Sequence, residues 1–366
     1  MEEAEQVTFL PMEAIGERGE LDLSRIREKD EVSTGYTLFF ENDVVVAKIT
    51  PCFENGKGAL VRGLFNGIGF GTTELHVLTP GPDLDGRYLY YLTVSEPFRK
   101  QGEAGMIGAA GQKRVPEEFI RNFRLVVPSI AEQRSITSYI DRETARIDAL
   151  IAEKGRVLTL LSEKRRALIT RAVTRGVDDS APIRDSGIPW LGMIPAHWKV
   201  ERLKFHLGNI EQGWSPQCDN FPANEDEWGV LKVGAVNRWE FNPNENKRLP
   251  EDAEPLLEYQ IALGDVLISR ANTKELLGSV SIVRTIPPKL LLCDKLYRLV
   301  FNSVQLDKEF LVLFLRSLAG RYEFERDATG ASSSMQNIGQ DSVRNVWVPI
   351  PPSDEQRVIT SYVISE

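Results

Sequence analysis

Residues 129–173 contain no proline and no cluster of turn-forming residues, and they carry a narrow apolar stripe. The stripe recurs every seven residues, with one lysine in the series: Ile140, Ile147, Lys154, Leu161 and Leu168. This spacing predicts an α-helix of about 45 residues, about 65 Å long at 1.5 Å per residue. Because a single helix cannot bury such a stripe, the pattern also predicts a partner helix.

Both ends of this helix carry boundary signals. Ser129 is a suitable N-cap, and Glu132 completes a capping box. The helix is expected to end near Arg175, where a connector with Pro, Gly and Asp begins. The Glu-Gln-Arg triplet at 132–134 is therefore interpreted as structural, with binding of a partner as the second possibility.

Outside this helix the apolar positions follow the patterns of short strands and short helices, and each pattern occurs twice. Residues 42–48 (Asn-Asp-Val-Val-Val-Ala-Lys) and 264–270 (Gly-Asp-Val-Leu-Ile-Ser-Arg) both predict a turn followed by a buried strand, at a shift of 222 residues. Further predicted pairs are strands at 74–78 and 296–300, helices at 88–92 and 310–314, and polar loops at 105–115 and 329–338.

A larger set of identical residues, repeated at a constant spacing, shows that a whole domain is duplicated. Ten residues recur 223 positions later: Arg121, Asn122, Pro128, Glu132, Gln133, Arg134, Ile136, Thr137, Ser138 and Tyr139 return at Arg344, Asn345, Pro351, Glu355, Gln356, Arg357, Ile359, Thr360, Ser361 and Tyr362. A solenoid repeat is only about 20–50 residues long, so this period excludes one. The predicted fold class is α+β, with two similar mixed α/β domains separated by a long coiled-coil-type helix.

Composition narrows the class of protein further. The 366 residues, 42% hydrophobic and 27% charged, are typical of a folded chain of two domains. No apolar run reaches the roughly 18 residues of a membrane span, and the acidic start is not a signal peptide. We therefore expect a cytoplasmic protein without membrane contact, and reduced cysteines.

Motifs that carry chemistry are sparse. Asp43 and Lys48 lie on a predicted strand at a spacing that points them to opposite faces, so they cannot share a metal. Residues 56–58 lack the spacing of a phosphate-binding loop, and no Gly-rich dinucleotide loop follows a predicted strand. Neither the histidines nor the cysteines have metal-ligand spacing. The sequence thus predicts a non-catalytic protein without cofactor or metal.

Three marks are similar to those of a known family. They are the opening Trp190-Leu-Gly…Ile194-Pro195…His197-Trp198, the segment 264–270, and the pattern Pro-x(3)-Glu-Gln-x-x-Ile at 128–136 and again at 351–359. With these segments in this order, the chain resembles the specificity subunit of type I DNA restriction–modification systems. The resemblance covers almost the whole length of the chain. The resemblance implies two target-recognition domains, each reading one half of a split DNA site. It also implies long helices that pack antiparallel, set the spacing and dock methyltransferase subunits.

The resemblance also implies a domain plan. Residues 1–128 would form the first target-recognition domain without its N-terminal part, 129–176 the central spacer helix, 177–189 a linker, 190–352 the second target-recognition domain, and 353–366 the start of a truncated distal helix. The second repeat has about 40 residues before the point where the first begins. We therefore expect a truncated product, or helices that pair between two chains.

The implied partners are double-stranded DNA, the methyltransferase (M) subunits and, through the complex, the restriction (R) subunits. The net charge of −9 is unusual for a general DNA-binding protein. A subunit that relies on the positive charge of its partners would resolve this, so we expect weak, salt-sensitive DNA binding by the isolated chain. A second hypothesis is a protein-interaction scaffold without DNA binding, or an inactive truncated remnant.

Candidate DNA-reading residues are polar side chains at matching places in the two domains. Arg and Lys suit guanine, whereas Asn and Gln suit adenine. The candidates are Lys57, Arg62, Gln112, Lys113, Arg114, Asn272, Thr273, Lys274, Ser332, Ser333, Ser334, Gln336 and Asn337. For partner contact the candidates are Lys154, Arg165 and Arg166 on the cationic half of the long helix. The alternative for each is an ordinary solvated side chain. Trp190 and Trp198 are expected to pack in the fold rather than stack on bases.

Overall fold

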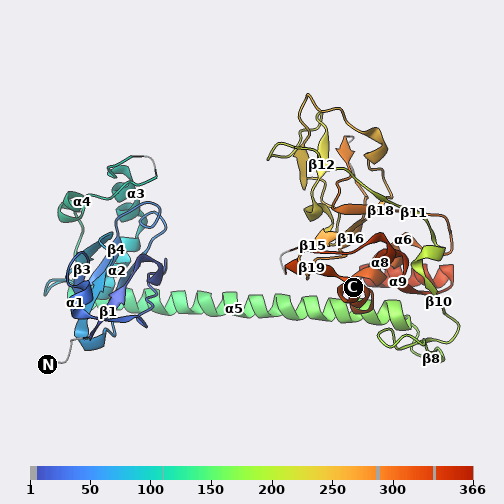
Figure 1. Cartoon of the computed structure of the whole chain (residues 1–366). Coiled ribbons are helices and arrows are strands. Elements are labelled where there is room, and N and C mark those ends of the chain that lie inside the picture. Colours follow the sequence, from blue (N-terminus) through green and yellow to red (C-terminus); the bar gives the residue numbers. More distant parts are fainter. Residues whose placement is uncertain (1–5, 110, 286–288, 333–334, 366) are drawn as a thin grey trace. The chain divides into compact units, whose positions relative to one another are not determined.

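The computed structural model describes residues 6–109, 111–285, 289–332 and 335–365 (Figure 1). The chain divides into two compact units, residues 1–154 and 155–366. Helix α5 (Ile130–Arg175) has 46 residues and contributes to both. Strands and helices mix in each unit, so the predicted α+β class with a long intervening helix is confirmed.

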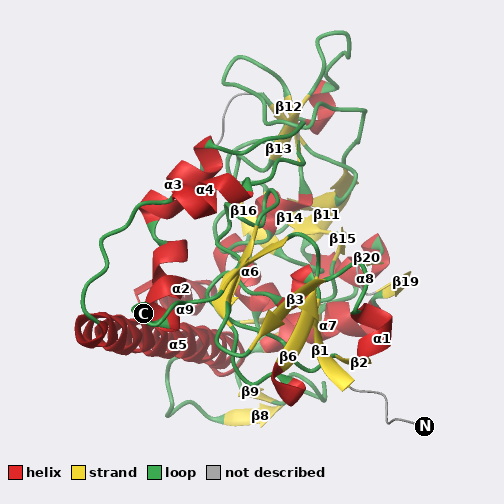
Figure 2. Ribbon diagram, turned by 90° about the vertical axis from the view of Figure 1, so that its left-hand side faces the viewer, coloured by secondary structure: helices red, strands yellow, loops and turns green. Residues whose placement is uncertain are grey.

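Among its described residues, the first unit contains two sheets and, besides its part of α5, four short α-helices. One sheet has the order β2 (Ile26–Glu28), β1 (Gln6–Leu10), β6 (Ile68–Gly71), β3 (Thr37–Phe40), and the other β5 (Gly58–Leu60), β4 (Val44–Ala47), β7 (Leu75–Leu78). The helices are α1 (Lys29–Val32), α2 (Gly86–Val94), α3 (Glu96–Ala104) and α4 (Glu117–Asn122). Figure 2 shows α3 and α4 next to each other, where Phe98 packs on Phe119 and Phe123.

The second unit has more strands. Its four-stranded sheet has the order β11 (Leu207–Gln212), β18 (Leu296–Phe301), β14 (Val266–Ser269), β16 (Val280–Ile282). Two sheets have three strands, one in the order β13 (Asn246–Arg248), β12 (Gly229–Leu231), β17 (Leu290–Leu291) and the other in the order β15 (Ala271–Asn272), β20 (Met335–Asn337), β19 (Thr329–Ser332). Two further sheets are strand pairs, β10 (Lys199–Arg202) with β21 (Trp347–Ile350) and β8 (Ile183–Asp185) with β9 (Met193–Pro195). Its helices besides α5 are α6 (Lys308–Arg316), α7 (Leu318–Asp327), α8 (Gln340–Arg344) and α9 (Ser353–Ser365).

Strands β4 and β14 form the centre of each repeat. All four residues of each are buried, because alternate side chains enter two different cores. Val45 and Ala47 face one core and Val44 and Val46 the other. The predicted turn followed by a buried strand is therefore present in both units.

The strands beside them correct the sequence alignment by one residue. Ala47 lies opposite Leu75, and the corresponding Ser269 lies opposite Leu296. Leu75 therefore matches Leu296, 221 residues later, and the predicted shift of 222 for this strand is wrong. The connection between the paired strands is one residue shorter in the second unit. A shift of one residue moves every side chain of a strand to the other face of the sheet. The correction therefore decides which side chains of β7 and β18 occupy equivalent places.

Both predicted polar loops have main-chain pairing to the residues that follow the buried strand. In the first unit Ile107 pairs with Arg114, which also pairs with Ile49. In the second unit β19 and β20 form a hairpin whose second strand pairs with β15. The predicted loop is therefore present among the described residues of the first segment, where these pairs are isolated bridges, whereas the second loop prediction is wrong because β19 and β20 form a hairpin.

The long helix begins and ends with defined contacts. Ser129 and Glu132 form the predicted capping box, with the Ser129 amide and hydroxyl donating to the Glu132 carboxylate at 2.9 and 2.7 Å. Near the other end, Ile169, Ala172 and Val173 are buried in the core of the second unit. Along the middle the apolar stripe is exposed: Ile147, Leu150, Ile151, Val157, Leu158 and Leu161. None of the described helices is long and apolar enough to cross a bilayer.

Candidate nucleic-acid interface

A buried glutamine joins the body of the first unit to the start of α5. The Gln133 side chain is 0% exposed. Its Oε1 accepts a hydrogen bond from the Asp85 amide at 2.8 Å, and its Nε2 donates to the carbonyls of Asp83 and Pro128, both at 2.8 Å. Asp85 is in turn the N-cap of α2. One side chain thus fixes the start of α2 against the start of α5.

The second unit repeats this junction. Gln356 is fully buried, accepts from the Asp307 amide and donates to the carbonyls of Gln305 and Pro351, again at 2.8 Å each. Asp307 caps α6 as Asp85 caps α2. The structural interpretation of the Glu-Gln-Arg motif agrees with these contacts, although the sequence did not reveal that the glutamine carries them.

The polar loop of the first unit presents three of the candidate DNA readers. Gln112, Lys113 and Arg114 are exposed, and the Lys113 carbonyl accepts from the Thr50 amide at 3.0 Å. This bond attaches the loop to the segment that follows β4. The three residues therefore stand on a loop that main-chain contacts support.

Arg114 already has an ionic partner. Its guanidinium makes a two-pronged contact with the Glu74 carboxylate, with Nε and Nη2 distances of 2.9 and 2.8 Å. This contact lowers the pKa of Glu74 and raises the pKa of Arg114. A DNA phosphate or guanine would have to compete with Glu74 for this guanidinium.

The other two candidates of the first unit lie apart from each other. Lys57 donates to the Met12 carbonyl at 3.1 Å, which commits its charge to a contact within the fold. Arg62 is exposed and follows β5, at the end of the β4–β5 pair opposite to the polar loop. The structure therefore does not group Arg62 with Gln112, Lys113 and Arg114.

The candidates of the second unit gather around the sheet of β15, β20 and β19. Asn272 pairs with Gln336, and Asn337 with Ala271. Asn272 itself is 8% exposed; its amide nitrogen donates to Asn237 at 2.8 Å and its oxygen accepts from the Thr273 amide. Asn272 thus shapes the turn and is not free to read a base.

The remaining candidates lie on the turn and the hairpin. Thr273 is half-buried and Lys274 is exposed. Ser332 belongs to β19, whereas Ser333 and Ser334 lie outside the described residues. Sequence reasoning missed Arg321, which donates to the carbonyls of Lys274 and Leu277 at 3.2 and 3.0 Å and so holds this turn from α7. No local signal in the sequence reveals such a long-range contact.

The candidates for partner contact differ in their surroundings. Lys154 and Arg166 are exposed, while the Arg165 guanidinium lies 4.5 Å from the centre of the Trp239 ring. Arg316 lies 4.9 Å from the same ring. Burial, with the nearby Arg321 and Arg165 charges, lowers the pKa of Arg316 to about 10. Arg165, Arg316 and Trp239 line a cavity of about 330 Å³ together with Arg166 and Arg321. The carboxylates of Glu275 and Glu325 also line it, so its wall carries charges of both signs.

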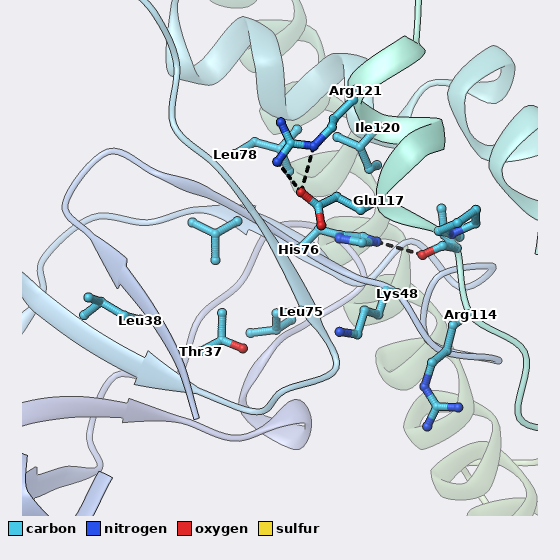
Figure 3. Close-up of a pocket in the computed structure, with 13 residues that line it drawn as sticks. Thr37, Leu38, Lys48, Leu75, His76, Leu78, Arg114, Glu117, Ile120 and Arg121 are labelled. Carbon is cyan, nitrogen blue, oxygen red and sulfur yellow. Dashed lines mark hydrogen bonds and ion pairs between the residues drawn. The ribbon is translucent and has the colours of Figure 1, made fainter. Parts of the chain in front are cut away.

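A second groove, of about 670 Å³, follows β7 in the first unit (Figure 3). His76 lies on its wall, 2.9 Å from the Val115 carbonyl, and burial lowers the pKa of this imidazole. Lys48 points toward the groove, as Figure 3 shows. Asp43, by contrast, accepts hydrogen bonds from the Phe40 amide and the Thr79 hydroxyl, which is a turn role. Within the described ranges, no group of three or more His, Cys, Asp or Glu side chains could hold a metal ion.

Comparisons with known proteins identify a matching family model and several similar proteins. The family model for the type I restriction modification DNA specificity domain matches residues 241–363. The Escherichia coli type I restriction enzyme EcoEI specificity subunit is 30% identical over 99% of this chain and 74% of its own length. The chain belongs to the family of type I restriction enzyme specificity subunits.

Another relative and two solved structures are also similar to this chain. The Escherichia coli EcoAI specificity subunit is 44% identical over 37% of this chain and 23% of its own length. The fold is similar to the HsdS subunit from Thermoanaerobacter tengcongensis, with TM-score 0.57 and 17% identity over 99% of this chain and 83% of that one. It is also similar to a chain from a study of assembly and conformational transition of the type I R-M system, with TM-score 0.66 and 18% identity over 99% and 84%.

The suspected family is thus confirmed, and with it the role in DNA specificity and the expectation of a non-catalytic subunit. Both tryptophans of the opening motif pack in this specificity subunit as expected. Trp198 is buried, and Trp190 stacks on Tyr322 with ring centres 5.2 Å apart.

Proposed function

We propose that each unit of this specificity subunit reads one half of a bipartite DNA site. The observation that carries this proposal is a construction that occurs in both units. In each, a polar segment pairs with the backbone just after a buried strand, and a buried glutamine joins the same domain to a helix. Two reading surfaces of the same construction are what a split target requires, because base contacts specify sequence.

The proposed first reading surface is Gln112, Lys113 and Arg114, and the proposed second is Lys274, Ser332, Ser333, Ser334, Gln336 and Asn337. In this proposal Thr273, Asn272 and Lys57 support these surfaces, and Arg62 contacts a phosphate instead of a base. Arg and Lys favour guanine, and Gln and Asn favour adenine.

In the same proposal α5 sets the distance between the half-sites. At 1.5 Å per residue its 46 residues span about 69 Å, about two turns of B-DNA. The domain plan is proposed as well, with recognition domains at 1–128 and 190–352. Lys154 and the exposed cations Arg165 and Arg166 would dock the M subunits, through which R subunits join the complex. A cytoplasmic location follows from this role.

The exposed stripe of α5 supports pairing with another helix. Ile151, Leu158 and Leu161 are 59%, 68% and 55% exposed, a large apolar area for a helix in water. We propose that a helix of a second chain covers this stripe. A monomer in sedimentation, with α5 fully protected from hydrogen exchange, would contradict pairing between chains.

The test is sequencing of methylated sites in cells that carry the matching methyltransferase. The double variant Gln112→Ala, Lys113→Ala should relax one half of the methylated motif, and Lys274→Ala, Gln336→Ala the other half. If either variant altered both halves equally, or if no two-part motif were methylated at all, the proposal would be wrong.

A further inference from the structure

A cavity of about 520 Å³ lies in the second unit, beside the sheet that carries the candidate readers. The charged side chains that line it are three lysines and one glutamate: Lys232, Lys247, Lys295 and Glu245. Lys232 directly follows β12, Lys247 lies on β13, and Lys295 directly precedes β18. Three strands thus bring positive charge to one hollow.

The single carboxylate does not balance these charges. Glu245 pairs with Lys232 at 2.9 Å, and Lys247 donates to the neutral side chain of Asn220 at 3.4 Å. Lys295 is exposed, and its ammonium group makes no hydrogen bond or ion pair with the other residues that the structure describes. The cavity therefore keeps an excess of positive charge, which favours an anionic occupant.

The cavity is joined directly to the sheet of β15, β20 and β19. Asn237, on the cavity wall, accepts a hydrogen bond from the side chain of Asn272 at 2.8 Å. The Lys295 carbonyl accepts from the Arg270 amide at 3.0 Å, and β15 begins at the next residue. An anion held in the cavity would therefore lie close to the proposed second reading surface.

The first unit has the opposite charge at the matching position. By the corrected register Glu74 corresponds to Lys295, and its carbonyl repeats the same main-chain bond, accepting from the Lys48 amide at 2.9 Å. The Glu74 carboxylate holds Arg114 in an ion pair. Asn337 takes the place of Arg114, because both pair with the second residue after the buried strand. The second unit thus has a lysine where the first has a carboxylate that occupies its own arginine.

We propose that this cavity binds a backbone phosphate of the DNA beside the second half-site, with Lys295 as the main contact. This site rests on the reading function proposed above and adds a phosphate contact to it. A lysine ammonium is a point charge that suits a phosphate, and phosphate contacts fix the position of a protein on the duplex without specifying bases. The first unit lacks the equivalent contact because Glu74 stands at the place of Lys295.

The salt dependence of DNA binding tests this site in the complex of the chain with its methyltransferase subunits. Lys295→Gln should weaken binding at low salt and reduce the slope of log affinity against log salt by about 0.9, the value of one phosphate contact. The methylated motif should keep all its bases. Lys204→Gln is the control, since it makes the same change of charge near the opposite end of β18, where Leu207 pairs with Phe301.

A second measurement needs no variant. Cys218 lines the same cavity and is half-buried, so DNA added to the complex should slow its alkylation by iodoacetamide. Unchanged alkylation would contradict the site.

The proposal is overturned if Lys295→Gln keeps the original slope or if Lys204→Gln reduces the slope equally. It is also overturned if Lys295→Gln weakens assembly with the methyltransferase subunits without DNA, because the cavity would then hold an acidic protein surface. An unchanged slope beside an intact two-part motif rejects the cavity alone. The absence of any two-part motif rejects the reading function and the phosphate site with it.

Discussion

At the scale of single residues, the side chains that position the candidate readers are better defined than the readers themselves. Gln133 and Arg321 each bind main-chain groups of a distant segment, whereas Asp43 accepts from the Phe40 amide of its own turn and from the Thr79 hydroxyl. The sequence marked Gln133 as recurrent and Asp43 as turn-forming, but not the atoms they contact. It gave no signal for Arg321 or for the Glu74–Arg114 pair, because such contacts depend on how segments far apart in the sequence meet.

The glutamine junction predicts a local loss of stability. Gln133→Leu leaves one amide and two carbonyls without partners at a part-buried junction, which should cost about 2–4 kcal/mol. Hydrogen exchange in α2 and at the start of α5 should accelerate accordingly. Arg134→Ala, at a neighbouring exposed position, is the control and should have little effect. Equal exchange in the two variants would show that the junction is not needed.

The Glu74–Arg114 pair predicts a gain in DNA binding. Glu74→Gln releases the guanidinium on the polar loop of the first unit, so the affinity of the subunit–methyltransferase complex for DNA should rise and its salt dependence should steepen. Glu96→Gln at the start of α3 makes the same change of charge at a different ion pair, that with Lys100. If both variants raise the affinity equally, the effect is one of net charge and Arg114 is not a contact.

His76 predicts a dependence of stability on pH. Burial holds the pKa of the folded imidazole below its ordinary value of 6.5, so the unfolded chain binds the proton more readily. The stability of the first unit should be complete above pH 6.5 and fall as the pH decreases below it. His76→Tyr, which copies Tyr297, should remove this part of the pH dependence in thermal unfolding followed by hydrogen exchange at β7. An unchanged pH profile would exclude His76 as its source.

At the scale of elements, the sequence predicted the type of most segments but not their pairing. The capping box and heptad stripe predicted α5 closely, because both are local signals. The alignment of β7 with β18 was wrong by one residue, and the hairpin of β19 and β20 was predicted as a loop. Both depend on which strand lies alongside, and alternation within a segment contains no such information.

Replacement of Gly155, in the exposed middle of α5, should increase the stability of this helix. A Cβ at this position would meet no atom within 4 Å, so Gly155→Ala should stabilise the helix by about 1 kcal/mol. Hydrogen exchange of nearby helix amides should slow about fivefold. Gly102→Ala in α3 is the opposite case, since its Cβ would lie 2.4 Å from Phe53 and should destabilise the first unit.

At the scale of the whole molecule, the repeat is the property that the sequence revealed most directly. The shift of about 222 residues already indicated two domains of one fold, and membership of the specificity-subunit family agrees with it. The identity of the bases read is a different matter. In the proposal above it depends on side chains at the tips of the two segments, and both tips include residues outside the described ranges.

The proposed spacer role makes a prediction of its own. Seven residues inserted after Leu158 would lengthen α5 by about 10.5 Å while nearly preserving its faces. The spacing between the halves of the methylated motif should then grow by about three base pairs, at 3.4 Å each. The bases in each half should not change. A motif with unaltered spacing would show that α5 does not set the distance.

The matching glutamine junctions have a consequence for how such subunits could diversify. Gln133 and Gln356 hold their domains by the same three hydrogen bonds. If a coding sequence were exchanged at the position of Pro128 or Pro351, the new domain would therefore meet a helix that can make the same bonds. Recombination between related genes at these points could transplant an entire domain and leave the joint intact. New target combinations would then arise by shuffling, without gradual redesign of the scaffold.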